Sequence, residues 1–564
     1  MKKTKYALVV ILLAFASLTW SFKEDLFLVS KNLDIFAAVY KEISINYVDE
    51  TNPASLMKTG IDAMLDELDP YTTYIPESEI EDYKLKYVST QFGGIGASTV
   101  FINGKLYVNE VSENYPAFKQ GIKPGDQFLK INDIEVKGKD RSAVSQLLRG
   151  PRGSVLKLLI DREGQSFAKE LIRDEIKQPN VSYSGIIDGI GYIRLDKFLE
   201  NSAQEVKDAA VELNKQHPNG IILDLRYNGG GILQEAVKIV NLFVNKDVLI
   251  VTQKGRNPEK TINYKTSYPA LLPEVPLVIL IGRSSASASE IVAGALQDLD
   301  RAVIIGQRSY GKGLVQQTFN LPYNSLVKVT VAKYFTPSGR CIQAIDYSHK
   351  NQEGQNDRFA DSLMTKYNTK TGRSVYNGNG IYPDILVEST KLSPVTIALI
   401  NKSLFFDYAN AYRKKHETIN AATEFKVSDA EYDTFLNELA HKDYGYTSNA
   451  EKLLAALRAE AAKEGDLSAF KGDLQNLENK VLLSKKTDLI THKAEIKRAL
   501  ETQIISRYYF EKGKIVQAFQ YDKELAAAKS VLASSTKMLA ILKGEGNYKI
   551  IGDPEKISPE SDND

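Results

Sequence analysis

The sequence predicts a multidomain α/β protein that carries a mainly-β insertion, an N-terminal helical arm and an α-helical C-terminal region. At 564 residues the chain is too long for a single hydrophobic core. Between residues 176 and 390, unbroken apolar runs such as VPLVILIG (275–282) alternate with segments of helical periodicity. Because fully apolar strands that alternate with helices are typical of a sheet covered on both faces, we expect an α/β core here.

The segments on either side of this core differ from it in their pattern of apolar residues and turns. Residues 30–87 place apolar side chains at helical spacing, which predicts an N-terminal helical region. Residues 88–175 consist of short strand-like runs between glycine turns, and Asn103-Gly104 is a dipeptide typical of a two-residue hairpin. Residues 391–552 are almost wholly helical in pattern, and the polar residues 553–564 predict a disordered tail.

Residues 1–21 are typical of an export signal. The basic start MKKTK is followed by the apolar run YALVVILLAFASLTW (6–20), which is shorter than the roughly 20 residues that a membrane span needs. We therefore expect export to the periplasm, with this segment either cleaved or kept as an anchor that attaches the chain to the inner membrane.

Composition argues against several classes of function. A formal net charge of +1 gives no electrostatic reason to bind nucleic acid. Cys341 is the single cysteine, so neither an internal disulfide nor a cysteine-ligated zinc site is expected. The five histidines are scattered and form no HExxH motif, so we expect no metal ion and no cofactor.

Residues 284–290, SSASASE, place four serines directly after the apolar run 275–282. Ser287 and Glu290 fit the capping box that begins many helices, and for a single serine this structural role would be the better explanation. The crowding exceeds what a cap needs, and a serine at a strand-to-helix junction lies where backbone N–H groups and the helix dipole favour an oxyanion. The pattern leaves two interpretations open, a helix cap and a nucleophile.

A nucleophilic serine needs a general base. No histidine occurs between residues 218 and 348, but the next strand ends in QRSYGKGLVQQ, which places Lys312 on a glycine-flanked turn. Two neighbouring strands would bring both exits to one edge of the sheet, and burial can depress a lysine pKa by roughly 3–5 units. Taken alone, Lys312 would be an exposed loop lysine, so its pairing with the serine segment is what favours catalysis.

Together these two segments resemble the S41 C-terminal processing peptidases, the tail-specific serine proteases with a Ser–Lys dyad. The segments YFTPSGRCIQ (334–343) and GNGIYPDI (378–385) also match signatures of that family. The resemblance extends over about residues 33 to 390, some two-thirds of the chain. It implies that the α/β core is a protease core of the crotonase or ClpP type.

The resemblance also assigns roles to individual residues. Ser287 becomes the nucleophile and Lys312 the general base, while Gln316, one helical turn beyond the lysine, holds it in place. Asp298 matches a position that is implicated in some members, with either a supporting or a structural role. Cys341 stands where a small residue such as serine is more usual, and no chemistry is assigned to it.

The glycine-rich segment DLRYNGGG (224–231) follows a buried strand and lacks the GxxxxGK[ST] pattern of a phosphate-binding loop. In the S41 family the equivalent glycines border the active site. This implies that the N–H of Gly229 or Gly230 forms an oxyanion hole together with the N–H of Ala288. The alternative for each glycine is a tight strand-to-helix turn.

Residues 88–175 resemble a PDZ domain of the processing-protease type. This implies that an extended peptide adds as a strand and that backbone N–H groups capture its terminal carboxylate. The alternative for the glycines of FGGIG (92–96) is a backbone bulge beside core aliphatic residues. In the functional interpretation, this segment is the carboxylate loop, with N–H groups from Gly94, Ile95 and Gly96 and an apolar floor of Phe92 and Ile95.

These observations favour an exported serine endopeptidase that binds protein C-terminal tails through its PDZ domain and cleaves peptide bonds with a Ser–Lys dyad. We expect protein substrates with accessible C-terminal tails as partners, and no nucleic acid. The C-terminal helical region is a candidate for docking an adaptor, for tethering a substrate or for forming a homo-oligomer. Arg149 or Arg152 is a candidate for relaying peptide occupancy to the protease core.

Two other classes of function compete with this one. A PDZ scaffold without proteolytic activity would present substrates to another protease, although the presence of both Ser287 and Lys312 argues against it. A crotonase-like acyl-CoA enzyme would share the architecture and the backbone oxyanion hole, but the export signal and the tail-binding module disfavour it.

Overall fold

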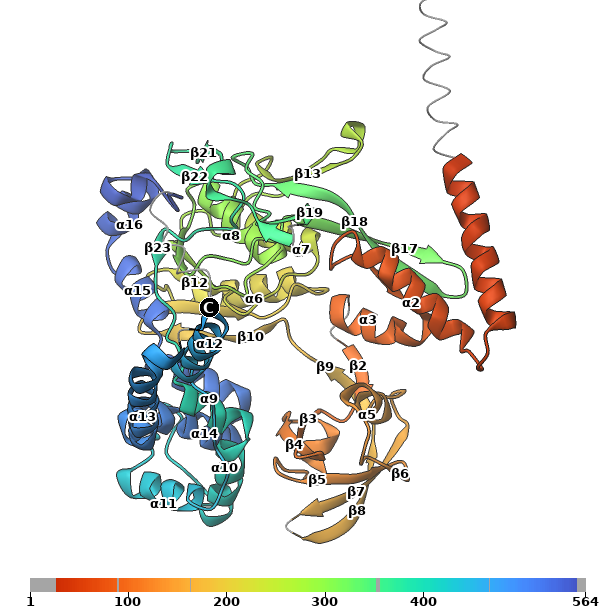
Figure 1. The fold of residues 1–564 in the computed structure, drawn as a ribbon. Helices are drawn as coiled ribbons and strands as arrows, with labels where there is room; N and C mark the ends of the chain where they lie inside the picture. The colour runs from red at the N-terminus through yellow and green to blue at the C-terminus, as the bar shows by residue number, and fades with distance from the viewer. Residues whose placement is uncertain (1–26, 89–90, 163, 351–355, 466, 555–564) are drawn as a thin grey trace, which may run out of the picture. The chain divides into compact units, whose positions relative to one another are not determined.

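The computed structural model describes residues 27–88, 91–162, 164–350, 356–465 and 467–554. The predicted signal segment and most of the predicted tail therefore lie outside the described residues. By its internal contacts the chain divides into two units (Figure 1). The smaller unit contains the described residues up to Ile80 together with residues 316–331 and 347–349, and the larger unit contains the rest.

The smaller unit joins the N-terminal arm to a β-hairpin from the middle of the chain. Residues 27–46 and α2 (Pro53–Asp66) are helical, as the periodicity predicts. The arm also contains a short strand that this periodicity does not predict. That strand, β1 (Thr73–Ile75), pairs antiparallel with β18 (Ser325–Phe335), which in turn pairs with β17 (Leu314–Leu321).

The larger unit is built around a six-stranded sheet in the order β10-β11-β12-β15-β16-β23. β10 (Val181–Ile187) pairs antiparallel with β11 (Ile190–Leu195), and all later pairs are parallel. The other strands are β12 (Ile221–Asp224), β15 (Leu277–Ile281), β16 (Val303–Gly306) and β23 (Ile385–Leu386). Every residue of β12, β15 and β16 is buried, which accounts for their unbroken apolar runs and confirms the predicted α/β core.

Helices cover both faces of this sheet, but they come from different parts of the chain. One face packs against α6 (Ser202–Asn214), α7 (Leu233–Asn241) and α8 (Ala288–Asp298), which connect the strands. The other face packs against α15 (Lys523–Leu532) and α16 (Ser535–Lys543), near the end of the chain (Figure 1). The last two helices of the segment 391–552, which the sequence predicts to be helical, therefore also cover one face of the central sheet.

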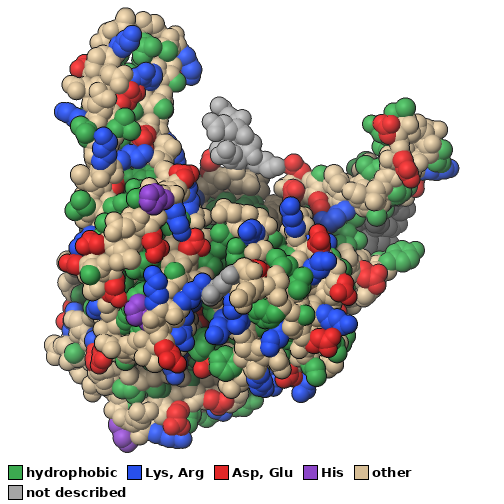
Figure 2. Space-filling model, turned by 90° about the horizontal axis from the view of Figure 1, so that it is seen from below, with side chains coloured by type: hydrophobic (Ala, Val, Ile, Leu, Met, Phe, Trp, Pro, Cys, Tyr) green, Lys and Arg blue, Asp and Glu red, His purple; other side chains and the backbone are tan. Residues whose placement is uncertain are grey.

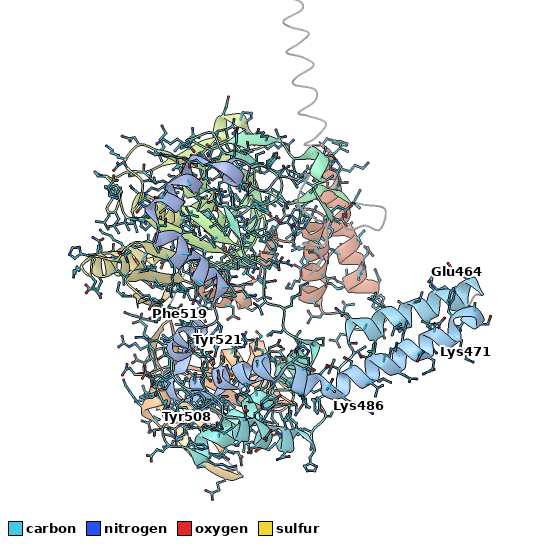
Figure 3. The ribbon with its side chains drawn as sticks, turned by 90° about the vertical axis from the view of Figure 1, so that its left-hand side faces the viewer. Glu464, Lys471, Lys486, Tyr508, Phe519 and Tyr521 are labelled. Atoms are coloured by element: carbon cyan, nitrogen blue, oxygen red, sulfur yellow. The ribbon has the colours of Figure 1, made fainter. Side chains whose placement is uncertain are left out.

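The helices before α15 form a second apolar core and a projecting hairpin. The core is made by α9 (Pro394–Asn401), α10 (Leu404–Lys415), α11 (Asp429–Leu439) and α14 (Lys493–Ala518). The hairpin pairs α12 (Asn449–Glu464) with α13 (Leu467–Thr491), and Figure 3 shows Glu464 and Lys471 at its far end. Among the described residues, no single helix has both the length and the apolar composition of a membrane span, and only the bent pair α15–α16 meets both conditions jointly.

The mainly-β insertion has a core of its own, as predicted. Its sheet has the order β3-β4-β5-β7-β8, with β6 beside β5, so β3 is an edge strand. Asn103 and Gly104 both have positive φ (50° and 74°) and form the predicted turn between β3 and β4. The strands are β3 (Ala97–Ile102), β4 (Lys105–Val111), β5 (Gln127–Ile131), β6 (Ile134–Glu135), β7 (Val155–Arg162) and β8 (Gln165–Ile172), with α4 (Pro116–Lys119) and α5 (Arg141–Leu148) as its helices.

Shorter elements complete the larger unit. β2 (Gln91–Gly94) pairs with β9 (Asp174–Lys177) at the two ends of the insertion. The last residues of β18 pair with β13, which pairs with β14. The remaining elements are α3 (Ile80–Tyr87), β13 (Leu249–Gly255), β14 (Ile262–Lys265), β19 (Ile345–Lys350), β20 (Asn356–Arg358), β21 (Lys366–Asn368) and β22 (Ser374–Tyr376).

Candidate active site

Three loops meet at one edge of the six-stranded sheet because their strands are parallel neighbours. β12 leads into residues 225–232 and α7, β15 leads into residues 282–287 and α8, and β16 leads into residues 307–313. The carboxyl edge of such a sheet is where ligands usually bind. The pairing of β15 with β16 confirms that the serine cluster and the YGKG turn leave adjacent strands.

The structure separates the four serines of the cluster by environment. Ser285 and Ser289 are buried, and each hydroxyl donates to a backbone carbonyl of residues 225–228 at 2.7 Å. Ser284 is exposed. Ser287 is half-buried, and its backbone (φ 55°, ψ −111°) lies in a region that residues with side chains rarely adopt. Strain of this kind, typically about 1–3 kcal/mol, is common at functional positions and distinguishes Ser287 from its neighbours.

Glu290 links the serine segment to the lysine turn. Its Oε2 accepts the backbone N–H of Ser287 at 2.8 Å and the backbone N–H of Lys312 at 2.9 Å. Its Oε1 accepts the Ser309 hydroxyl at 2.5 Å and the Gly311 N–H at 2.7 Å. The side chain is fully buried; burial raises its pKa, and the four donated hydrogen bonds oppose that rise. Because one carboxylate oxygen bridges their amides, Ser287 and Lys312 lie side by side.

Tyr334 supports the same pair from the carbonyl side. Its hydroxyl lies 2.5 Å from the carbonyl oxygen of Lys312 and 3.1 Å from that of Ser287. The Tyr334 side chain is buried, and Lys312 is half-buried. The backbones of the two predicted dyad residues are thus held by two independent side chains, one that contacts their amides and one that contacts their carbonyls.

The loop of residues 225–232, called the glycine loop below, packs directly against the serine segment. The Asn228 carbonyl accepts the Ala286 N–H at 3.2 Å, which fixes the loop to the residue before Ser287. Gly230 has φ 93°, and a Cβ there would lie 2.8 Å from the Ser287 Cβ and 2.9 Å from the Ala288 nitrogen, so only glycine fits. The Gly230 N–H donates to Asn228 Oδ1 at 2.9 Å, whereas a Cβ at Gly229 would meet open space. Both glycines stay predicted oxyanion donors, together with Ala288.

The structure corrects the expected position of Gln316. Residues Leu314–Leu321 form the extended strand β17, so Gln316 is not one helical turn beyond Lys312. A strand rises about 3.3 Å per residue and places residues four apart much farther from each other than a helix does. Gln316 lies in the smaller unit, where its Nε2 donates to Thr330 Oγ1 across the hairpin at 3.1 Å.

Asp298 lies at the opposite end of α8 from Ser287. At 1.5 Å per residue, that helix separates the two by roughly 16 Å. The Asp298 carboxylate pairs with the buried Arg340 at 2.8 Å and accepts the Ser338 N–H at 3.0 Å. Of the two roles expected for Asp298, the structural one fits these contacts.

In the mainly-β module, the segment Phe92–Gly96 combines features of both interpretations. It leads directly into the edge strand β3, whose free edge is what strand addition requires. Ile95 is 3% exposed and belongs to the module's core, and Phe92 is half-buried. The glycines are also needed for packing, since a Cβ on Gly94 would lie 2.9 Å from the Phe92 ring and one on Gly96 would lie 2.3 Å from Tyr115.

The two arginines of RGPRGS form local contacts. Arg149 pairs with Asp82 of α3 and stacks over the Phe92 ring at 5.3 Å. These side chains line a pocket of about 360 Å³ beside the Phe92–Gly96 segment, with Lys86 and Lys197. Arg152 pairs with Asp174 at 3.1 Å. Arg149 therefore contacts the Phe92–Gly96 segment through the Phe92 ring, whereas Arg152 pairs with a residue of β9, the strand that pairs with β2.

Comparison with known proteins adds to this geometry. Residues 189–349 match "Peptidase family S41", residues 107–162 match "PDZ domain", and residues 395–532 match "Probable PDZ-protease, C-terminal helical domain". The carboxy-terminal-processing protease of Bartonella bacilliformis is 34% identical over 322 residues, which cover 56% of this chain and 73% of that protein. A probable CtpA-like serine protease of Staphylococcus haemolyticus is 36% identical over 307 residues, or 54% of this chain and 61% of that protein.

The chain belongs to peptidase family S41. It is a serine-type peptidase with a PDZ domain inserted before its protease core. Among solved structures, the photosystem II D1 C-terminal processing protease is 26% identical, with a TM-score of 0.34, and covers 62% of this chain and 86% of that one.

Sequence reasoning missed the two side chains that brace Ser287 and Lys312 in this S41 peptidase. The sequence pattern predicts only a helix-capping role for Glu290, and Tyr334 is only the first residue of a family signature. The signal in each case is a polar residue in an apolar or buried setting, but the partners lie in the loops that follow β15 and β16. The six hydrogen-bonding contacts that join these residues to Ser287, Ser309, Gly311 and Lys312 could not be inferred without the sheet order.

Figure 2 shows acidic and basic side chains intermingled over the face it presents, in keeping with a net charge of +1. Within the described ranges, no group of three or more His, Cys, Asp or Glu side chains is placed to hold a metal ion. Cys341 is half-buried with a free thiol, and burial raises its pKa.

Proposed function

We propose that this S41 peptidase is exported and cleaves proteins whose C-terminal tails bind its PDZ domain, with Ser287 as nucleophile and Lys312 as general base. The observation that carries the proposal is the bridge at Glu290 Oε2, which accepts the backbone N–H of both residues at 2.8 and 2.9 Å. A nucleophile and its base must lie within hydrogen-bonding reach, and this bridge supports that arrangement.

In the proposed reaction, the uncharged amine of Lys312 takes the hydroxyl proton of Ser287 while the serine oxygen attacks the scissile carbonyl carbon. The oxyanion that forms accepts the Ala288 N–H, at the N-terminus of α8, and an N–H of the glycine loop. Donors of this kind typically contribute about 2.7–4 kcal/mol each. Lys312 returns the proton to the leaving nitrogen, and the acyl-enzyme is then hydrolysed by a water that the same amine deprotonates.

The choice of substrate is proposed to come from the PDZ domain. β3 is an edge strand, so an extended tail can pair with it, and the segment before it, Phe92–Gly96, is the candidate for capturing the terminal carboxylate. Two relatives are named for carboxy-terminal processing or as CtpA-like proteases, which supports the same class of substrate.

The proposed dyad is tested by cleavage of an unfolded protein with a free C-terminus. Ser287→Ala and Lys312→Ala should each reduce the rate of cleavage by at least about 10³-fold, because each removes a member of a unit that acts together. Ser284→Ala is the matched control, since Ser284 is an exposed serine of the same cluster, and it should retain wild-type activity. Equal cleavage by wild type and Ser287→Ala would overturn the proposal.

The tail-binding step is tested separately with peptides and the Ser287→Ala protein. A peptide with a free carboxylate should bind at least about tenfold more tightly than the same peptide with an amidated C-terminus, because hydrogen bonds to a charged group typically contribute about 1.5–3 kcal/mol. Equal affinity would contradict carboxylate capture. If cleavage persists while both peptides bind equally, the protease assignment stands and the tail-recognition step is wrong.

Export is proposed from residues 1–21 alone. Fusion of these residues to a reporter enzyme that is active only outside the cytoplasm should give activity, and fusion of a variant with Leu12 and Leu13 changed to Lys should give none. A reporter that is equally inactive in both fusions would contradict export.

A further inference from the structure

Arg226, in the loop between β12 and α7, is held by carboxylates from two distant parts of the chain. Its Nη2 donates to Asp224 at 2.7 Å and to Asp522 Oδ2 at 2.6 Å, and its Nη1 donates to Asp522 Oδ1 at 2.9 Å. Nη1 also lies 3.4 Å from Glu524. The Arg226 side chain is 11% exposed and that of Asp522 is 9% exposed. A bidentate, buried pair of this kind fixes geometry as well as charge.

Asp522 is also the N-cap residue of α15. Its Oδ1 accepts the Leu525 N–H at 2.8 Å and so caps the helix. Just before it, Phe519 packs edge-to-face against Tyr192 with ring centroids 4.9 Å apart, and the Tyr192 hydroxyl donates to Asp224 at 2.5 Å. Figure 3 labels Phe519 and Tyr521 in this stretch, which connects the helical region to the sheet. The start of α15 is thus anchored to the end of β12.

Glu524 joins the same helix to the second catalytic loop. Its Oε1 accepts a hydrogen bond from Gln307 Nε2 at 3.3 Å. Gln307 directly follows β16 and begins the 307–313 loop that carries Lys312. The N-terminus of α15 therefore contacts the first residues of both the glycine loop and the lysine loop (residues 307–313).

A short chain of contacts leads from Arg226 to Ser287. Asn228, two residues after Arg226, accepts the Ala286 N–H at 3.2 Å and the Ser289 hydroxyl at 2.7 Å. These two donors lie on either side of Ser287. A shift of Arg226 would move the Asn228 carbonyl and, with it, the glycine loop relative to the nucleophile, and misplacement by about 1 Å can cost roughly 10²-fold in rate.

We propose that Asp522 and Glu524 are positioning residues of the protease site, through which the C-terminal helix α15 sets the placement of the glycine and lysine loops. This inference rests on the proposed function and deepens it, because it gives the last helices of the chain a part in catalysis. Neither carboxylate touches the reacting atoms; Asp522 acts through Arg226, and Glu524 acts through Arg226 and Gln307.

The test uses the full chain with Asp522→Asn. Asparagine caps helices as well as aspartate does, so this change keeps the cap and removes the charge that faces Arg226. Asp429→Asn is the matched control, because Asp429 is an exposed carboxylate that pairs with Lys493 and Lys497 at the start of α11. Glu524→Gln is a milder second variant that keeps the test decisive if Asp522→Asn does not fold.

Two readouts separate positioning from simple stabilisation. For Asp522→Asn, kcat for peptide cleavage should fall about tenfold while KM stays within about twofold, and Asp429→Asn should leave both unchanged. Hydrogen exchange measured by mass spectrometry should become faster for the peptide covering residues 224–232 and stay unchanged for α8. Glu524→Gln should change both quantities in the same direction by a smaller factor.

Two outcomes would overturn the inference. One is wild-type kcat together with unchanged exchange at residues 224–232 in both variants. The other is faster exchange spread evenly over the protease core, which would show a loss of stability without a local effect. If wild type and Ser287→Ala cleave equally, the proposed function fails, and the exchange measurement still decides whether α15 holds the glycine loop.

Discussion

The two faces of the protease sheet are covered in different ways. α6, α7 and α8 connect neighbouring strands, so each helix lies close in sequence to the strands that it covers. α15 and α16 come from the other end of the chain and cover the opposite face. Helices on both faces nevertheless reach the same site, since Ser287 is the N-cap of α8 and Asp522, the N-cap of α15, binds Arg226.

This difference shows why a helical segment can be essential without carrying a motif. On the face toward α15 and α16, the side chains of Ile222, Val278, Leu280 and Ile305 are fully buried. Burying one such aliphatic side chain contributes about 1.5–3 kcal/mol, so the whole face is comparable to the net stability of a domain, about 5–15 kcal/mol. The core therefore depends on residues that follow the family match at 189–349.

The largest expected effect comes from removing the distant helices. A chain that ends after Tyr521 lacks α15 and α16 and should be insoluble or show no cooperative thermal unfolding, because it exposes the apolar face of the sheet. The control replaces residues 457–480, the far part of the α12–α13 hairpin, with a short Gly-Ser loop and should keep cooperative unfolding. A truncated chain that is soluble and has the wild-type midpoint of thermal unfolding would show that α15 and α16 are not needed to stabilise the sheet.

The sequence was sufficient for features that depend on neighbouring residues. Alternation of apolar runs with helical periodicity located the α/β core, and Asn103-Gly104 located the hairpin turn. The adjacency of the serine segment and the lysine turn, the two predicted catalytic segments, followed from the parallel order of β15 and β16. In each case the signal lay within one element or between two consecutive strands.

Contacts between distant segments could not be predicted in this way. Arg226 and Asp522 are 296 positions apart, and nothing in either segment identifies the other. A spacing of four positions from Lys312 predicts one helical turn to Gln316, yet Leu314–Leu321 is a strand because it pairs with β18. Its hydrogen bond to Thr330 is decided by that pairing.

A direct comparison of the two faces is possible with adjacent residues of β12. Ile222 faces α15 and α16, whereas Leu223 faces α6, α7 and α8, and both are fully buried. Ile222→Ala and Leu223→Ala should each lower the free energy of unfolding by about 2–5 kcal/mol, measured by denaturant titration. A loss below about 1 kcal/mol for Ile222→Ala alone would mean that the distant helices cover their face only loosely.

A smaller, pH-dependent effect is expected at Tyr192, on the face toward α15. Burial, followed by the nearby charge of Asp224, raises the pKa of this phenol well above its usual value of about 10. The unfolded chain therefore loses this proton at a lower pH than the folded chain, so the contribution of Tyr192 to stability is complete below about pH 10 and declines as the pH rises further.

Tyr192→Phe removes that titration together with the hydrogen bond to Asp224. It should lower the free energy of unfolding at pH 8 by about 0.5–1.5 kcal/mol and make stability fall less steeply above pH 10 than in wild type. Urea unfolding at pH 8 and pH 10.5 measures both effects, with Tyr227→Phe, at an exposed tyrosine, as the control. The same slope above pH 10 in wild type and Tyr192→Phe would contradict the assignment.

The smallest effect is expected in the hairpin, which covers neither face of the sheet. Arg458 of α12 pairs with Glu478 of α13 at 2.8 Å, but the two side chains are 42% and 30% exposed. Glu478→Gln should therefore lower the free energy of unfolding by less than about 1 kcal/mol, and added salt should reduce even that difference. Asp522→Asn, which neutralises a carboxylate of 9% exposure, should cost more in the same denaturant titration. Equal losses of unfolding free energy for Glu478→Gln and Asp522→Asn would mean that the ion pair at the start of α15 stabilises the fold no more than a surface ion pair does. The two faces of the sheet would then differ only in the apolar packing of the helices that cover them.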